Sequence, residues 1–122
     1  MDKEFSFRKL ICYQKGRLLV KEIYKIVRTL PSEEKYALGD QLRRAVVSVT
    51  SNIAEGTGRQ SFKDQAHYIE LSYGSLIEVM SQLDVALDMG FIDNAKHNEL
   101  EAQSSEEARI LSGYRASLLS KL

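Results

Sequence analysis

Apolar residues recur every three or four positions along most of this 122-residue chain, which is the period of an amphipathic α-helix. Four segments carry the pattern: residues 8–30, 33–55, 62–89 and 94–121. No segment alternates apolar and polar residues as a β-strand does. Because loops of a few residues force successive long helices to run antiparallel, the sequence predicts an all-α fold. We expect one domain over residues 1–122, an antiparallel up-down-up-down four-helix bundle.

Residues with known preferences for helix ends mark the first boundaries. Pro31 stops the first helix, since the residue before a proline is pushed out of the α region. Ser32, followed by two glutamates, is a suitable N-cap for the second helix. We expect Gly56 and Gly58 to end that helix, because glycine accepts the left-handed conformation common at helix C-termini.

The third segment has the most regular pattern. Ser61 and Asp64 form a start similar to a capping box, Gly90 closes the helix, and Asp93 or Asn94 begins the fourth. The apolar residues of this third segment are spaced four and three apart in turn, a heptad pattern suited to packing against long neighbouring helices. They are Phe62, Ala66, Ile69, Tyr73, Leu76, Met80, Leu83 and Leu87.

The first helix has more apolar surface than a bundle needs. Its apolar residues between Leu19 and Leu30 cover an arc of about 160°, whereas a core-facing stripe needs about 100°. Self-association is the simplest way to bury the excess, so we expect a homo-oligomer. One face of the same helix carries a basic stripe: Arg17, Lys21, Lys25 and Arg28.

Charge is unevenly distributed, although 17 Lys and Arg balance 17 Asp and Glu. Residues 1–61 hold 12 basic and 7 acidic residues, and residues 62–122 hold 5 and 10. Such asymmetry is found in proteins with a nucleic-acid-binding surface. It is also found where helices of opposite charge face one another, which is the more ordinary interpretation.

Composition excludes several classes of protein. Cys12 is the only cysteine, which excludes an internal disulfide and a multi-cysteine zinc site. Residues Met1 to Glu4 do not resemble a signal peptide, and no apolar run approaches the roughly 18 residues of a membrane span. We therefore expect a cytoplasmic protein with no membrane partner.

Candidate chemistry is sparse. Asp64 and His67 share a helix face, but a di-iron site in a bundle needs two Glu-x-x-His pairs. His97 has Asn94 where the second acid would stand. Cys12 is expected to be a buried structural residue. The sequence thus predicts no catalytic residue, no metal site and no cofactor.

Two features of the second helix and its end admit more than one interpretation. Ser48, Asn52 and Glu55 lie three or four positions apart beside the apolar face. We interpret them as a polar network at a subunit interface. Arg43 and Arg44 fit either that network or a surface that faces RNA or DNA. The loop 56–61 can hold a phosphate at the helix N-terminus that follows, but a simple turn is the more ordinary interpretation.

The segment from Gln41 to Arg59, QLRRAVVSVTSNIAEGTGR, resembles the signature of small four-helix-bundle proteins known as 23S rRNA intervening-sequence proteins. Leu30-Pro31 and the segments 74–78 (GSLIE) and 87–92 (LDMGFI) fit the same pattern. The resemblance covers nearly the whole chain, from about Phe7 onward. It implies an antiparallel four-helix bundle that assembles into a homopentamer.

The chain is also similar to the accessory protein of diversity-generating retroelements, a pentameric barrel whose basic surface binds nucleic acid beside a reverse transcriptase. The resemblance therefore implies structured RNA or DNA as a partner, and a reverse transcriptase or a ribosomal component as another. The more serious departure from the family is in charge. This chain is neutral overall, whereas the retroelement proteins are strongly basic, and binding by phosphate neutralisation needs a concentrated basic face.

These observations favour a non-enzymatic, oligomeric nucleic-acid-binding protein that recognises RNA backbone or shape through a basic face. The sequence shows no aromatic stacking platform beside the basic residues. The alternative is an oligomeric protein-interaction scaffold that binds no nucleic acid, which the neutral charge favours. The residues expected to contact phosphates are Arg17, Lys21, Lys25, Arg28, Arg43, Arg44 and Arg59.

Overall fold

Four long helices account for most of residues 5–122, the part of the chain that the computed structural model describes. They are α1 (Ile11–Thr29), α3 (Leu38–Thr57), α4 (Phe62–Asp88) and α5 (Asn94–Leu119). A 3₁₀-helix, η1 (Ser6–Lys9), precedes them, and a one-turn helix, α2 (Ser32–Lys35), lies between α1 and α3. No residue from 5 to 122 is in a β-strand, so the all-α prediction is confirmed. The expectation about Met1 to Glu4 lies outside the described residues.

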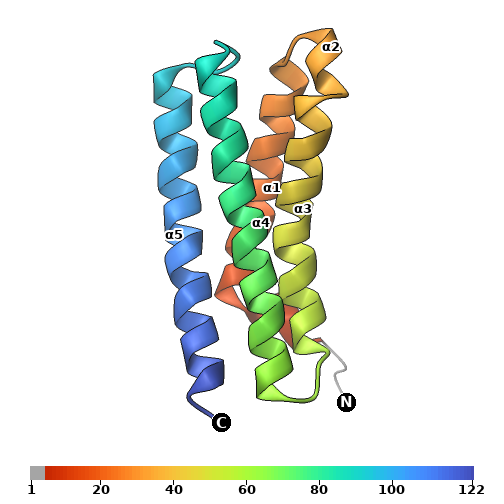
Figure 1. Cartoon of the computed structure of the whole chain (residues 1–122), viewed down its shortest axis with the longest axis vertical. Helices are drawn as coiled ribbons and strands as arrows, with labels where there is room; N and C mark the ends of the chain where they lie inside the picture. The colour runs from red at the N-terminus through yellow and green to blue at the C-terminus, as the bar shows by residue number, and fades with distance from the viewer. Residues whose placement is uncertain (1–4) are drawn as a thin grey trace.

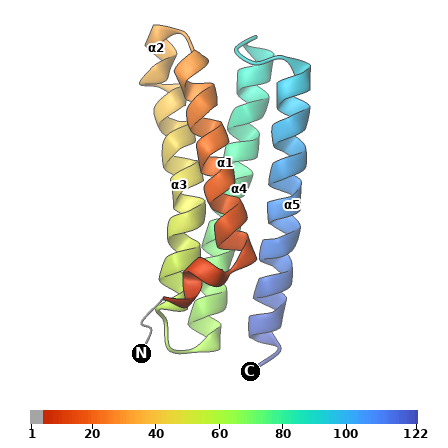
Figure 2. The same ribbon diagram turned by 180° about the vertical axis from the view of Figure 1, so that it is seen from behind.

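The long helices lie side by side along the long axis of the molecule (Figure 1). Both views place α2 and the α4–α5 connection at one end, and the α3–α4 connection at the other (Figures 1 and 2). Each long helix packs on two neighbours, since α3 lies between α1 and α4, and α5 lies between α4 and α1. The contact of α1 with α5 is less extensive than that of α3 with α4. Within residues 5–122, none of the helices combines the length and the apolar composition that crossing a membrane requires.

The structure corrects the apolar seam predicted for the third helix. Phe62 and Tyr73, two members of that seam, are more than a third exposed, whereas Ser72 and Val79 are buried. The Ser72 hydroxyl donates a hydrogen bond to the backbone oxygen of Val49 in α3 (2.7 Å). The buried face of α4 is therefore turned toward α3, because α3 is the neighbour with which α4 packs most extensively.

Most of the wide apolar arc of α1 is buried within this one chain. Val20 is half-buried, and Tyr24 is 36% exposed. The arc is wide because α3 and α5 pack on two sides of α1. The excess apolar surface predicted on this helix is therefore smaller than expected. The residues of the arc that lie in the core are Leu19, Ile23, Ile26, Val27 and Leu30.

Two predicted helices begin later than expected. The first, predicted from residue 8, begins at Ile11, because Leu10 is extended (φ −72°, ψ 132°). The second, predicted over residues 33–55, is interrupted where Ala37 leaves the helical conformation (φ −116°, ψ −94°). Beyond this break, α3 approaches α1 so closely that a Cβ on Gly39 would lie 2.9 Å from Val27 Cγ1. The close approach of α3 to α1 at Gly39 thus comes directly after the break.

The N-caps of α4 and α5 are as predicted. The Ser61 hydroxyl accepts the backbone N–H of Asp64 (3.0 Å), and the Asp93 carboxylate accepts that of Lys96 (2.8 Å). The cap predicted at Ser32 is wrong: the N-cap of α2 is Pro31, and no side chain caps it.

The prediction that glycines end α3 is confirmed for Gly58, which is the C-cap of the helix, but the left-handed conformation expected there is wrong. Gly58 is right-handed (φ −83°), and Gly56 lies inside the helix, where a Cβ would come within 3.0 Å of Tyr68 Cβ. Gly56 therefore allows α3 and α4 to approach closely rather than terminating α3. Gly90, with φ 76°, does adopt the left-handed conformation after α4.

Candidate nucleic-acid interface

The basic stripe predicted on α1 is exposed along its whole length. Lys25 pairs with Glu22 on the same helix (Nζ–Oε2 3.1 Å), and the Arg17 guanidinium lies over the ring of Tyr13, 5.9 Å from its centroid. Lys21 and Arg28 make no ion pair or hydrogen bond with any residue from 5 to 122. The stripe therefore retains cations that are available to a ligand.

The acidic later helices do not neutralise this stripe. Glu106 of α5 pairs with Lys15 (3.2 Å), on the flank of α1 that faces α5. Glu70 of α4 pairs instead with His67 (3.7 Å) and Arg115 (3.6 Å). Among the described residues of α1, the interpretation that oppositely charged helices face one another thus applies to Lys15 and not to the stripe.

The two arginines of α3 differ in how firmly they are held. Arg43 donates a hydrogen bond to the backbone oxygen of Lys35 (3.1 Å) and forms an ion pair with Asp40. Its guanidinium is thereby fixed against the α2–α3 turn. Arg44 is exposed and has no ion-pair or hydrogen-bond partner in the described part of the chain. Of the two, Arg44 is the one available to a phosphate.

A shallow cleft of about 510 Å³ crosses the outer face of α3 and reaches α1. Tyr24 of α1 lines it together with both arginines, and this residue is 36% exposed. The sequence indicated no aromatic stacking platform beside the basic residues, and the structure adds one partly exposed aromatic side chain, Tyr24, next to the two arginines. The signal was in the sequence, since Tyr24 adjoins Lys25 and follows Lys21 by three positions. The lining residues are Tyr24, Arg43, Arg44, Val47, Ser48, Ser51 and Asn52.

Arg59 lies apart from the other basic residues, in the α3–α4 connection at the end of the bundle opposite α2 (Figure 1). Its guanidinium pairs with Glu55 (2.9 Å) and stacks over the ring of Tyr68, 4.5 Å from the centroid. Its backbone oxygen accepts a hydrogen bond from Gln65 Nε2 (2.8 Å). These contacts hold the loop to α4 and favour the interpretation of residues 56–61 as a structural turn.

The three residues predicted as an interface network divide into two local groups. The hydroxyls of Ser48 and Ser75 lie 2.8 Å apart and link α3 to α4, and the Asn52 amide donates to the backbone and hydroxyl oxygens of Ser48 (3.0 Å each). Glu55 contacts Arg59 instead. All three residues therefore have partners inside one chain, and their place at a subunit interface stays a prediction.

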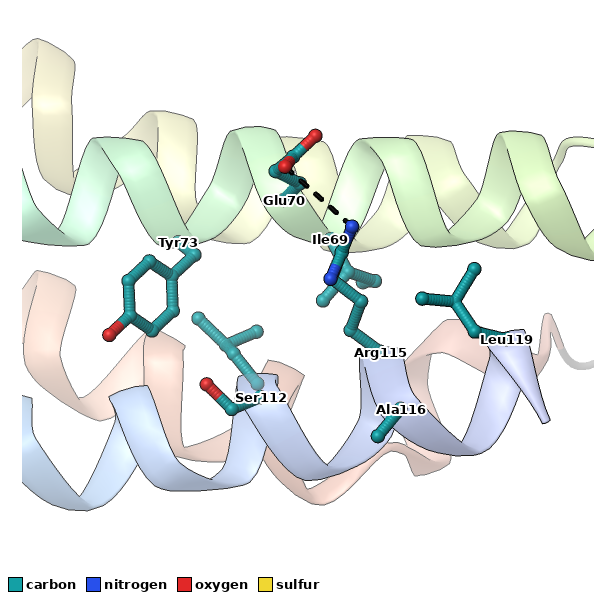
Figure 3. A pocket seen from close by; sticks show the side chains of 8 residues that line it. Ile69, Glu70, Tyr73, Ser112, Arg115, Ala116 and Leu119 are labelled. Carbon is teal, nitrogen blue, oxygen red and sulfur yellow. Dashed lines mark ion pairs between the residues drawn. The ribbon is translucent and has the colours of Figure 1, made fainter.

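A second cleft, of about 290 Å³, lies between α4 and α5 (Figure 3). Apolar side chains such as Ile69 and Leu119 line much of it, and Tyr73 stands at one side. Arg115 reaches from α5 toward Glu70 of α4, which compensates its charge. A cleft whose cation is already paired is poorly suited to phosphate.

Cys12 is buried, as predicted. Burial, together with the nearby Glu107, raises the pKa of its thiol to about 12. A thiol that stays protonated at neutral pH is a poor nucleophile. Burial therefore disfavours the reactive thiolate form of Cys12, whose side chain packs in the core.

Sequence reasoning missed Glu107. Its side chain is 1% exposed, and neither carboxylate oxygen has a hydrogen-bond partner in the described structure. Burial and the neighbouring Glu106 raise its pKa to about 8, against a smaller lowering by Lys15. Gly16 makes room for it, since a Cβ there would lie 3.0 Å from Oε2. The available signal was its position, seven residues after Leu100 and four before Leu111, in phase with the apolar face of α5.

Comparison with known proteins gives a family and a fold. The sequence profile of the family described as 23S rRNA-intervening sequence protein matches residues 8–113. Among solved structures, the chain is similar to a protein of unknown function from the S23 ribosomal protein family of Bacteroides thetaiotaomicron VPI-5482. The TM-score is 0.80 at 17% sequence identity, over 86% of this chain and 98% of that chain. At that identity the likeness shows the fold alone. Among curated proteins, the sequence search finds no match.

Proposed function

We propose that this chain, which belongs to the 23S rRNA-intervening sequence protein family, is a non-enzymatic protein that binds nucleic acid, with structured RNA as the preferred partner. The observation that carries the proposal is a group of exposed cations on α1 and α3 that have no ion-pair or hydrogen-bond partner among residues 5–122: Lys21, Arg28 and Arg44. We call these three residues the open cationic set. Contacts of this kind to phosphates position a nucleic acid but read little base sequence.

Tyr24 supports the preference for RNA. Its exposed ring shares the α3 cleft with Arg43 and Arg44. Proteins commonly recognise RNA through unstacked bases in loops and bulges, which pack on aromatic rings and guanidinium planes. A ring beside cations thus supplies a stacking contact as well as charge neutralisation.

Some of the predicted phosphate contacts have a charge that is already compensated within the chain. Lys25 and Arg59 already pair with glutamates, as does Lys15. We call Lys15, Lys25 and Arg59 the paired set. Binding a phosphate through these residues would require breaking an existing ion pair, so we expect them to contribute less.

We further propose that the chain, as an antiparallel up-down-up-down bundle, assembles into a homo-oligomer, a homopentamer by the family resemblance. Exposed apolar residues on α4 support assembly, since Leu71, Val85 and Met89 are 42%, 46% and 62% exposed. A ring would repeat the open cationic set and raise avidity without new contacts. We place such a protein in the cytoplasm, with a ribosomal component or a reverse transcriptase as its protein partner.

The test is fluorescence anisotropy of labelled structured RNA and duplex DNA with the purified protein across a salt series. We expect tight binding that weakens steeply with salt. Replacing the open cationic set by Lys21→Gln, Arg28→Gln and Arg44→Gln should weaken binding to all sequences. It should also flatten the salt dependence by about one unit of slope for each phosphate that is no longer neutralised. The variant Lys15→Gln, Lys25→Gln, Arg59→Gln removes the same charge and should bind nearly as the wild type does.

Two outcomes would contradict the proposal. Equal losses of affinity in both triple variants would mean that total charge, rather than this face, governs binding. Absence of binding even at low salt would remove nucleic acid as the partner and favour the alternative, an oligomeric protein-interaction scaffold.

A further inference from the structure

A histidine and two carboxylates meet near the end of the bundle where α4 ends and α5 begins, at the top of Figure 1. Asp84 comes from α4, and His97 and Glu101 come from α5. One ligand atom from each lies within 4.8 Å of the other two. His97 Nε2 is 2.8 Å from Asp84 Oδ1, and the His97 side chain is only 14% exposed.

The positions of these residues suit a metal ion. His97 and Glu101 are four residues apart on one helix, so both side chains lie on the same face one turn apart. Asp84 stands opposite them on the adjacent helix. Two ligands from successive turns of one helix and a third from another element are a common way to build a zinc site on a helical scaffold.

Little positive charge among the described residues compensates the carboxylates of this cluster. His97 is the partner of Asp84, and Glu101 has no ion-pair or hydrogen-bond partner among residues 5–122. Asp84 and Asp88 lie near the C-terminus of α4, and no basic residue occupies the last turn of that helix. Negative side chains are unfavourable at this end of a helix because the helix dipole is negative there. A bound cation would offset both effects.

We propose that Asp84, His97 and Glu101 bind a divalent transition-metal ion of the zinc type, with water in the fourth position. Zn²⁺ takes imidazole nitrogen and carboxylate oxygen at about 2.0–2.2 Å. Asp84, whose side chain is 67% exposed, can turn to reach such an ion. Mg²⁺ and Ca²⁺ are poorer candidates, because they prefer sites made entirely of oxygen ligands. The ion would cross-link α4 and α5 independently of the proposed function, since none of its ligands belongs to the open cationic set.

A second histidine–carboxylate pair in the chain serves as a control for the metal-binding test. His67 and Glu70 form a similar pair on α4, with Nδ1 and Oε1 3.7 Å apart and both side chains 59% exposed. No third ligand residue joins them among the described residues. A histidine beside one carboxylate is thus present in two places, but among the described residues a third ligand joins the pair only at His97.

Isothermal titration of the tag-free protein with ZnCl₂ tests the proposal. We expect one ion per chain. Asp84→Asn and Glu101→Gln should each weaken Zn²⁺ binding by about tenfold or more, whereas His67→Gln should leave the affinity unchanged. Titration with Co²⁺ gives a second readout, because its visible absorption reports four-coordinate geometry with a nitrogen ligand.

No heat of Zn²⁺ binding in the wild type would overturn the proposal. So would an equal loss of affinity in His67→Gln and Glu101→Gln, which would indicate scattered surface binding. Glu101 is partly exposed and has no partner among the described residues, so Glu101→Gln should keep its helical circular dichroism spectrum. The same variant should bind RNA as the wild type does, which separates this test from that of the proposed function.

Discussion

Glu107 carries a carboxyl group in the interior of the bundle, where no described residue donates a hydrogen bond to it. Such a group avoids the cost of burying a charge by keeping its proton, and its raised pKa of about 8 expresses this. Cys12 and Gly16 lie beside it on α1. Ionisation of Glu107 would therefore place a negative charge between α1 and α5, which pack less extensively than α1 and α3.

We predict that the free energy of unfolding falls as the pH rises between about 4.5 and about 8. In that range the folded chain keeps the Glu107 proton and the unfolded chain has released it, so the unfolded state binds fewer protons and gains stability with pH. The pKa difference corresponds to at most about 5 kcal/mol over the whole range. Urea unfolding followed by circular dichroism at several pH values measures it.

Glu107→Gln removes the titrating group while nearly keeping its size, so its unfolding free energy should change much less over the same range. Glu106→Gln, at the exposed neighbouring position, should keep most of the wild-type dependence. A wild-type slope in Glu107→Gln would show that another group is responsible.

At the scale of the element, the two serines predicted as helix N-caps differ in what they stabilise. Ser61→Ala removes the hydroxyl that caps α4 and should lower the free energy of unfolding by about 1 kcal/mol. Ser32→Ala should have almost no effect, because its side chain caps no helix. Chemical denaturation of the two variants provides the comparison, and equal decreases in stability would contradict the assigned caps.

The same contrast shows which elements the sequence can predict. The caps at Ser61 and Asp93 depend on residues three positions away, and a local pattern contains that information. The break before α3 accompanies the close approach of Gly39 to Val27, a contact between helices that no local pattern encodes. The turn of the α4 face toward Ser72 and Val79 likewise depends on how α3 packs against it.

The candidate site likewise combines features that the sequence can predict with features that depend on tertiary packing. The stripe on α1 follows from helical spacing alone, and the Lys25–Glu22 pair, three residues apart, could have been foreseen. The bond from Arg43 to the backbone oxygen of Lys35 could not, because it depends on the turn between α2 and α3. Asp84, His97 and Glu101 come together through the packing of two helices, which a search for one spacing pattern does not detect.

At the scale of the whole molecule, we predict that Leu71→Glu with Val85→Glu lowers the mass of the assembly in analytical ultracentrifugation. These exposed residues of α4 would place charges in an apolar contact between subunits. Leu18→Glu with Ile11→Glu adds the same charge at apolar residues of α1 that are also exposed and should leave the mass unchanged. A monomeric wild type, or equal dissociation in both variants, would contradict assembly through α4.

The buried proton of Glu107 also changes the charge of the whole molecule. The sequence counts as neutral at pH 7 when every carboxyl group is taken as ionised. With a pKa of about 8, Glu107 is mostly uncharged at that pH, so the folded chain carries close to one positive charge. Native isoelectric focusing should therefore place the folded protein above the value of 6.7 that its composition gives, and a ring of identical subunits would gain that charge once per subunit.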